Sequence, residues 1–282
     1  MQRLMIGSVD RDCHPTMMKC LALAALAMHA LPVAGRTVVE VGGALPSESG
    51  YLQTPAGGMP GTATAKRPTL AEIDLDGGHF RWLGARLDFN PSAKSDPAAV
   101  PFRLRVHARF TTIGDGATSM IEQAFTIRGG VFEVGDSVRS RVSYDGLTLA
   151  ATGVFGLGPG LSVEIGPVVG WTAFDFTMRG ERHQIDRAYH VTTFGLVGEV
   201  RRDFGNGWQI RAKIAASPAF EGVGSRHAAE TWLGRDLTER FGVAIGARFE
   251  AFGYDDAHKQ ELPNRLNVSR RVVPALAVRL RL

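Results

Sequence analysis

The chain has 282 residues, of which 44% are hydrophobic, and its formal net charge at pH 7 is +4. So mild a charge, spread evenly along the sequence, excludes the basic patches that nucleic-acid-binding proteins carry. The mean hydropathy is -0.02, and no uncharged apolar run approaches the roughly 18 residues that a membrane-spanning helix needs, so the apolar residues are abundant but dispersed.

The first element is a compact apolar run over residues 20–31 (CLALAALAMHAL), which follows Lys19. Small residues then occupy the −3 and −1 positions of a cleavage site that would end at Gly35. A basic start, an apolar middle and small residues before the cleavage site are the parts of a secretory signal peptide. We therefore expect residues 1–35 to be removed, with Met17 as an alternative start codon; a short buried helix is the other interpretation.

Both cysteines, Cys13 and Cys20, fall within this segment. A mature chain without thiols needs no oxidative folding and has no cysteine nucleophile or cysteine metal site. Cys20 stands at the start of the apolar run, whereas the cysteine of a lipoprotein follows such a run. These positions predict that the chain carries no lipid anchor.

Residues 36–78 form the next segment, which is rich in Gly, Pro, Thr and Ala. The stretch SESGYLQTPAGGMPGTATAKRP within it has neither the period of a helix nor that of a strand. We expect an extended periplasmic leader. It is either a disordered linker or a segment that docks in or under the folded domain, for which Tyr51, Leu52 and Met59 supply apolar side chains.

From about Phe80 onward the sequence alternates polar and apolar residues, most clearly over residues 102–110 (FRLRVHARF). Successive side chains of a strand point to opposite faces of the sheet, so this segment has one apolar face and one basic face. A half-exposed strand of a soluble sandwich would alternate in the same way. The connections between the segments therefore decide the fold.

Tight turns alternate along the chain with longer polar links, the pattern of short periplasmic turns and longer outer loops in membrane barrels. In lipid, only a closed sheet pairs every backbone polar group. The sequence thus predicts an all-β fold, an antiparallel transmembrane β-barrel over residues 79–282. The tight turns are 156–160 (GLGPG), 204–207 (FGNG) and 238–240, and the longer links are 179–187, 220–226 and 255–269.

We expect ten strands, an even number that places both ends of the barrel on the periplasmic side. The alternative is eight strands, with residues 69–76 (TLAEIDLD) pairing with strand 79–89 and residues 119–134 forming an outer-loop hairpin. The expected strands are 79–89, 101–113, 119–134, 137–155, 161–176, 188–203, 208–219, 227–237, 241–254 and 270–282.

The leader, the alternation, the turns GLGPG and DFGNG and the final VRLRL resemble the small outer-membrane β-barrel proteins of Gram-negative bacteria. The leader motif QTPAGGMPGT followed by KRPTLAEI is similar to one in a set of uncharacterised outer-membrane proteins. The resemblance covers residues 80–282, although the family usually ends in an aromatic residue and this chain ends in Leu282. It implies a location in the cell outer membrane, contact with lipid and lipopolysaccharide, and recognition of the C-terminal strand by the barrel-assembly machinery. The surface partner stays unidentified.

The lumen of this barrel is predicted to be polar and net basic, because the charges of each strand share one parity. A lipid-facing charge would cost ~2–4 kcal/mol near the bilayer midplane, which favours placing these charges inside. The predicted basic residues of the lumen are Arg103, Arg105, His107, Arg109, Arg201, Arg211, Lys213, Arg248, Arg279 and Arg281, and their acidic partners are Asp88, Glu164, Glu199 and Glu250.

Two functions are compatible with such a lumen. A barrel of eight to ten strands is too narrow for a wide channel, so the charges are expected to pair and plug it, which indicates a structural or interaction role. The alternative is a narrow anion-preferring pore, in which the excess of arginine raises the local anion concentration.

An enzyme is the second alternative. Asp256-Ala257-His258 resembles the Asp-x-His part of the omptin proteases, which need a second acidic pair across the barrel mouth. The acidic pair Asp74/Asp76 is expected near the periplasmic end, on the wrong side for that role. We therefore expect no catalytic residues here.

The sequence evidence for a hydrolase site or a metal site is equally weak. A lipid A acyl hydrolase needs Ser, His and an acid together, and Ser225, His227 and Glu230 supply these types only loosely. His183, His227 and His258 lie in separate segments without the spacing of metal ligands. We expect no metal, no cofactor and no nucleic-acid partner.

Overall fold

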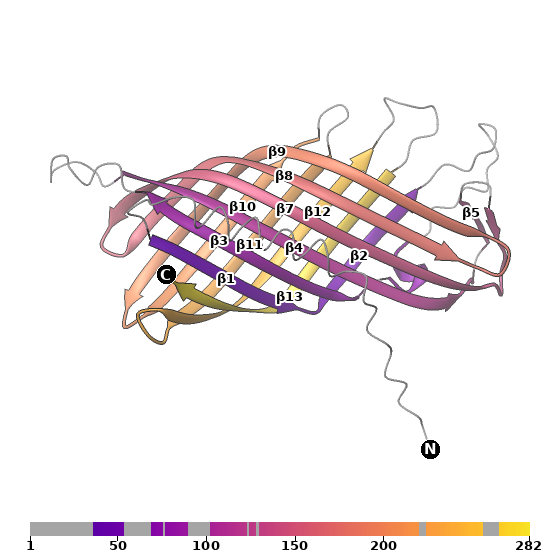
Figure 1. Cartoon of the computed structure of the whole chain (residues 1–282), viewed down its shortest axis with the longest axis horizontal. Helices are drawn as coiled ribbons and strands as arrows, with labels where there is room; N and C mark the ends of the chain where they lie inside the picture. The colour runs from indigo at the N-terminus through magenta and orange to yellow at the C-terminus, as the bar shows by residue number, and fades with distance from the viewer. Residues whose placement is uncertain are drawn as a thin grey trace, which may run out of the picture. The chain divides into compact units, whose positions relative to one another are not determined.

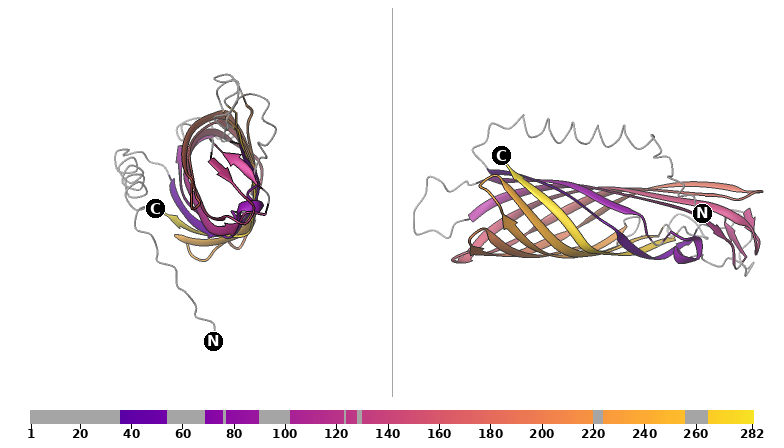
Figure 2. Two further views of the ribbon diagram at one scale, coloured as in Figure 1. Left: turned by 90° about the vertical axis from the view of Figure 1, so that its right-hand side faces the viewer. Right: turned by 90° about the horizontal axis from the view of Figure 1, so that it is seen from below.

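The computed structural model describes residues 36–53, 69–75, 77–89, 102–122, 124–127, 130–219, 224–255 and 265–282. Within them one antiparallel sheet closes on itself, because β1 (Arg36–Ala44) pairs both with β3 (His79–Phe89) and with β13 (Arg265–Arg281). The result is a closed β-barrel, whose wall is seen from the side in Figure 1 and along its axis in the left view of Figure 2.

The wall of the barrel has ten strands. β2 (Pro46–Gln53) continues β1 after Leu45 along the same neighbour, β13, so β1 and β2 count as one wall strand. This makes ten of the 11 strands that form the main sheet of the described residues. The other wall strands are β4 (Phe102–Met120), β7 (Ser137–Gly158), β8 (Leu161–Arg179), β9 (Gln184–Gly205), β10 (Trp208–Ser217), β11 (Ser225–Asp236) and β12 (Phe241–Asp255).

The predicted count of ten is confirmed, but one wall strand is a different part of the chain. Residues 36–53, predicted as a leader, form β1 and β2. Residues 119–134, predicted as a wall strand, contribute only the end of β4 and a separate hairpin of β5 (Phe125–Ile127) and β6 (Gly130–Phe132). Within 69–75 the chain forms the 3-10 turn η2 (Ala71–Ile73), not a strand paired with β3.

Glycine explains why β1 was mistaken for a leader. Gly42 lies beside Trp82 of β3, and a Cβ atom on Gly42 would stand 2.0 Å from Trp82 Cζ2. The indole occupies the space that any larger residue at this position would need. The glycine therefore makes room for a buried aromatic ring, although in the sequence it reads as a sign of irregular structure.

Burial in this barrel is inverted relative to a soluble protein. Leu196 and Ile214 are 60% and 68% exposed, whereas Glu250 is 1% exposed. In water this would leave a large apolar surface uncovered, but in a bilayer the apolar side chains contact lipid. The chain is therefore a transmembrane β-barrel, the architecture of outer-membrane proteins, and lies in the cell outer membrane. No helix of the described residues is long and apolar enough to cross a membrane.

The lipid-facing belt is clearest on β9. Phe194, Leu196 and Val200 are exposed on its outer face, between His190 on one side and Arg202 on the other. This stretch of about ten residues matches the length that a tilted strand needs to cross the hydrocarbon. Trp171 of β8 pairs with Thr192 at the margin of the belt, where aromatic residues of membrane barrels gather.

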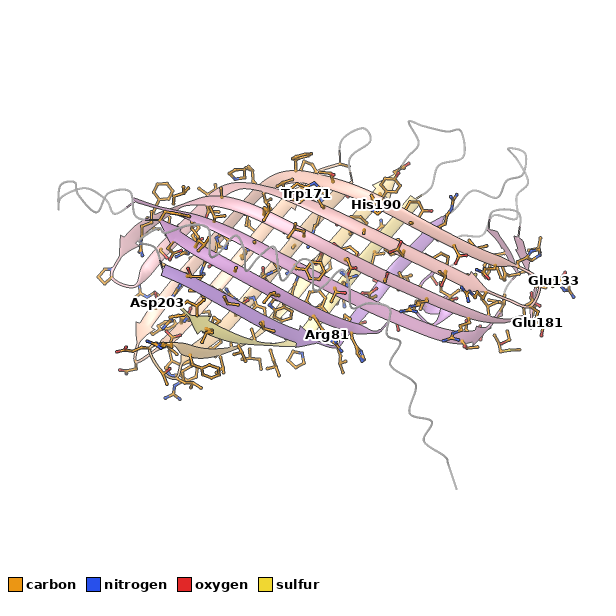
Figure 3. All side chains as sticks on the ribbon, in the orientation of Figure 1. Arg81, Glu133, Trp171, Glu181, His190 and Asp203 are labelled. Atoms are coloured by element: carbon orange, nitrogen blue, oxygen red, sulfur yellow. The ribbon has the colours of Figure 1, made fainter. Side chains whose placement is uncertain are left out.

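Four wall strands are much longer than a bilayer requires. β4 and β8 have 19 residues and β7 and β9 have 22, against the roughly 9–11 of a membrane crossing. Their surplus forms a sheet beyond the belt, which we call the outer extension (residues 111–120, 137–146, 172–179 and 184–192). In Figure 3, Glu133 and Glu181 mark its tip, far from Trp171. Its outward side chains are polar, as at Arg139 and Asp175.

The two ends of the barrel differ. At one end, here called the short-turn end, lie the tight turns after β7, β9 and β11 together with the start of β1 and the end of β13. The outer extension marks the opposite, long-loop end. Single-chain barrels place their short turns in the periplasm, so we expect the short-turn end to face the periplasm.

Candidate functional site

The lumen has two layers, an apolar one toward the long-loop end and a charged one below it. The predicted lumen residues share this interior parity, but not all are equally covered. Arg105, Arg211, Arg248, Arg279, Glu164, Glu199 and Glu250 are buried; His107, Arg109, Lys213, Asp88, Arg201 and Arg281 are partly buried; and Arg103 is exposed near the short-turn end.

Glu250 of β12 is the centre of the first charge cluster. Its carboxylate accepts hydrogen bonds from Arg226 Nε at 2.8 Å and Arg248 Nη2 at 2.7 Å, and from the Tyr144 hydroxyl at 3.2 Å. Arg270 pairs with Glu48 of β2 in the same layer. Guanidinium groups replace part of the hydration that a buried carboxylate loses, so these pairs offset the cost of placing charges in the lumen.

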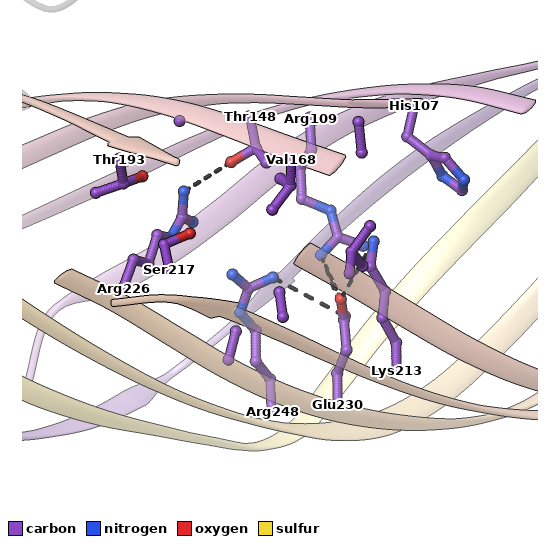
Figure 4. Close-up of a pocket in the computed structure, with 15 residues that line it drawn as sticks. His107, Arg109, Thr148, Val168, Thr193, Lys213, Ser217, Arg226, Glu230 and Arg248 are labelled. Carbon is purple, nitrogen blue, oxygen red and sulfur yellow. Dashed lines mark hydrogen bonds and ion pairs between the residues drawn. The ribbon is translucent and has the colours of Figure 1, made fainter. Parts of the chain in front are cut away.

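Glu40 and Glu230 hold the second cluster. Arg109 Nη1 donates to Glu230 Oε1 at 2.8 Å, and Arg211 Nη2 donates to Glu40 Oε2 at 2.6 Å. Arg109 also reaches Glu40 at 3.6 Å and so links the two carboxylates across the lumen. Figure 4 shows Arg109, Glu230 and Arg248 converging. Because the partners come from β1, β4, β10 and β11, the cluster ties opposite walls of the barrel together.

The third cluster lies nearer the short-turn end. Arg105 pairs with both Asp88 and Glu164, and its Nη2 donates to Asp88 Oδ2 at 2.8 Å. Glu164 Oε2 lies 3.2 Å from His107 Nε2 and 3.3 Å from the Thr152 hydroxyl. One arginine therefore serves two carboxylates here, the reverse of the ratio at Glu250.

Two adjoining cavities remain between these clusters, with volumes of about 60 Å³ and 50 Å³. His107, Arg109 and Lys213 line both. We call the two together the chamber. Small side chains of β7 to β10 line part of the larger cavity, and its charged side chains come from β4, β10, β11 and β12 (Figure 4). The small residues are Thr148, Ala150, Val168, Gly170, Thr193, Val197, Ala215 and Ser217.

Some polar groups of the chamber have no partner within the described residues. The Arg86 Nε and the Glu199 Oε1 are buried without a hydrogen bond. Lys213 Nζ approaches Glu230 only to 3.9 Å, although that carboxylate already binds Arg109. The smaller cavity is lined by Arg86, Glu199 and Lys213 together. Unsatisfied groups that share a polar cavity indicate a bound water or ion.

An apolar cap covers the chamber toward the long-loop end. The segment around η2 inserts Leu70, Ile73 and Leu75, which are 1%, 0% and 0% exposed, and Leu70 N donates to Gly50 O at 3.0 Å. The β5–β6 hairpin adds the stacked rings of Phe125 and Phe132. These side chains belong to one apolar cluster with the inner faces of β4, β7 and β8.

Arginines join the two layers. The Arg248 guanidinium lies 5.5 Å from the ring centroid of Phe80, and that of Arg211 lies 5.2 Å from Trp232. Trp232 in turn meets Trp82 edge-on at 5.5 Å. Cation–π contacts let a charged layer pack directly against an aromatic one. Trp82 and Trp232, although aromatic residues near predicted strand ends, therefore face the lumen and not the lipid.

The enzyme candidates are not assembled in the described residues. His227 is exposed on the outer face of β11, whereas Glu230 is buried inside, so the two cannot act together. Asp74, expected at the periplasmic end, follows η2 at the long-loop end instead. Asp256 and His258 lie outside the described residues. Within the described ranges no group of three or more His, Cys, Asp or Glu side chains is arranged to hold a metal ion.

Sequence reasoning missed several members of the clusters. The predicted lumen residues do not include Glu40 and Glu48, which lie in the predicted leader, or Arg226 and Glu230, which lie on β11. The available signal was the shared parity of Arg226, Glu230 and Trp232 opposite His227 and Leu233. On a strand with so many alanines and polar residues, that signal is weak.

Comparisons with known proteins found similar solved structures but no family. No protein-family model and no curated protein matches the chain. It is similar to the outer membrane protease OmpT of Escherichia coli at 7% identity, over 89% of this chain and 98% of that one, with a TM-score of 0.47. The translocator domain of the autotransporter NalP of Neisseria meningitidis matches at 10% identity over 94% and 95% of the chains, with a TM-score of 0.41. Ail of Yersinia pestis matches at 12% identity over 88% and 99%, with a TM-score of 0.38.

Proposed function

We propose that this outer-membrane barrel is a membrane anchor with a closed lumen, and that it acts through the outer extension. The observation that carries the proposal is the filling of the lumen. Charged clusters bridge opposite walls, the apolar cap covers them, and the two cavities of the chamber are about 60 Å³ and 50 Å³. Spaces of this size hold a few water molecules and not a continuous column.

The outer extension is the natural surface for a partner. Building strands far beyond the bilayer serves no purpose for membrane anchoring, because about ten residues already span it. The outward side chains of the extension include Arg139, Asp175 and Asp186, which suit a polar partner. Lipopolysaccharide is the expected neighbour at its base, near Trp171. The barrel-assembly machinery is expected to recognise the apolar outer face of the last strand, with Leu276, Val278 and Leu280.

A conductance measurement tests the closed lumen. Purified protein inserted in planar bilayers is expected to give no current steps, because the apolar cap excludes ions and water. A triple variant, Leu70→Ser with Ile73→Ser and Leu75→Ser, replaces the cap with polar groups and should produce discrete openings that the wild-type protein lacks. A general porin in the same bilayers controls for insertion. Steady current through the wild-type protein would contradict the proposal.

The pore is the second candidate, and one observation favours it. Arginine and lysine side chains outnumber carboxylates in the chamber lining. An excess of fixed positive charge selects anions. If wild-type current is found, its reversal potential in a salt gradient should therefore be that of an anion-selective pore.

A further inference from the structure

The chamber holds more positive than negative side chains, and some of its charges are already paired with each other. Arg109 and Arg211 face Glu230 and Glu40, at 2.8 Å and 2.6 Å. Two cations thus meet two carboxylates, and each arginine has a direct partner. This part of the lining is neutral and needs no further ligand.

The remaining charged side chains of the chamber carry an excess of positive charge. The smaller cavity is also lined by Arg86 and Lys213, and Glu199 is the carboxylate that remains there besides Glu40, which pairs with Arg211. Within the described residues the Arg86 Nε has no hydrogen bond and Glu199 leaves one oxygen without a donor. Beside the larger cavity Arg226 and Arg248 both pair with Glu250, and Arg248 also lies 3.9 Å from Glu230. Arginine and lysine side chains therefore outnumber carboxylates in the lining of both cavities.

A buried cation without a counter-charge is costly, because protein does not replace the hydration that it loses. The chamber also supplies space, since about 50 Å³ lies open beside Arg86 and Lys213. We propose that the chamber binds one small inorganic anion, of chloride to phosphate size, in the cavity lined by these two residues. The anion accepts hydrogen bonds from the guanidinium and the ammonium and neutralises the excess charge.

The anion reaches this site from the short-turn end. The apolar cap blocks the other end, whereas Arg103 is exposed and Arg201 is partly exposed near the short turns. Positive side chains around a narrow mouth raise the local anion concentration. We therefore expect the site to exchange anions with the compartment that the short turns face.

The test compares unfolding temperatures of the full-length protein in detergent across sodium salts at constant ionic strength. Chloride, bromide and phosphate should raise the midpoint in a saturable way, whereas gluconate, too large for the chamber, should not. Arg86→Met is expected to raise the half-saturating concentration about tenfold or more, because it removes a charge-assisted donor. Arg81→Met is the matched control, since Arg81 lies on the exposed outer face of the same strand; it should behave as wild type.

A bromide-soaked crystal keeps the proposal testable if Arg86→Met does not fold. An anomalous peak in the cavity beside Arg86 and Lys213 is expected. Equal midpoints in chloride and gluconate, or a chamber that holds only water bridging Arg86 to Glu199, would overturn the proposal. Both results are independent of bilayer conductance, because a closed barrel and an open one can each bind an anion here.

Discussion

Replacing Glu250 by alanine is expected to lower the free energy of unfolding by about 3–5 kcal/mol, the usual effect of removing one partner of a buried ion pair. Arg226 and Arg248 both donate to this carboxylate, and their side chains are 7% and 5% exposed. The substitution leaves both guanidinium groups in the lumen without their shared acceptor. Urea unfolding of the refolded protein in detergent, followed by the fluorescence of its tryptophans, measures the loss.

Two further variants separate charge from packing in that result. Asp175→Ala removes a carboxylate from the exposed outer face of β8 and should change stability by no more than about 0.5 kcal/mol. Glu250→Leu combined with Arg248→Met should be less destabilised than Glu250→Leu alone, because fewer cations are left unpaired. Similar losses for Glu250→Ala and Asp175→Ala would mean that the lumen is hydrated and the cluster contributes little.

The second large effect is expected at the lipid-facing surface. Leu196→Arg places a charge within the apolar belt of β9 and should cost about 2–4 kcal/mol if it lies near the bilayer midplane. Ala188→Arg is the matched variant, because Ala188 is exposed on the same face of the same strand but lies in the outer extension. There the new arginine stands opposite Asp175 and should be tolerated.

Folding into lipid vesicles at increasing urea concentration gives both values. The difference between the two arginine variants is the informative quantity, since each adds the same side chain to β9. A belt at Leu196 predicts a large difference. Equal effects of the two substitutions would place the membrane elsewhere on the barrel.

Much of this architecture can be predicted from the alternation of polar and apolar residues along each strand. Alternation located nine of the ten wall strands and put charged residues such as Arg105 and Glu164 on the same side, because lipid penalises exposed charge on every strand. The predicted segments for strands 161–176 and 241–254 agree with β8 and β12 to within a few residues. Where each strand leaves the membrane was harder to predict, because alternation continues unchanged into the outer extension.

The parts that failed depend on contacts between distant residues. Gly42 and Pro46 interrupt the pattern of β1 and β2, yet Gly42 is required by Trp82 of the neighbouring strand. The cap formed by Leu70, Ile73 and Leu75 shows no periodic sequence pattern, because it is built on a short turn whose side chains enter the lumen. The partners within the lumen, such as Arg211 with Glu40, are far apart in sequence and follow only from closure of the barrel.

A scan of single cysteines along β9 tests the account most directly. Spin labels at positions 184–204, in a chain lacking Cys13 and Cys20 and inserted in lipid vesicles, report collisions with oxygen and with a water-soluble reagent. We expect a period of two, with oxygen favoured at Phe194, Leu196 and Val200, the water-soluble reagent favoured at Asp186 and Ala188, and neither at Val197 or Glu199. Labels at 194–200 that all meet the water-soluble reagent would contradict a membrane barrel with a closed, charged interior.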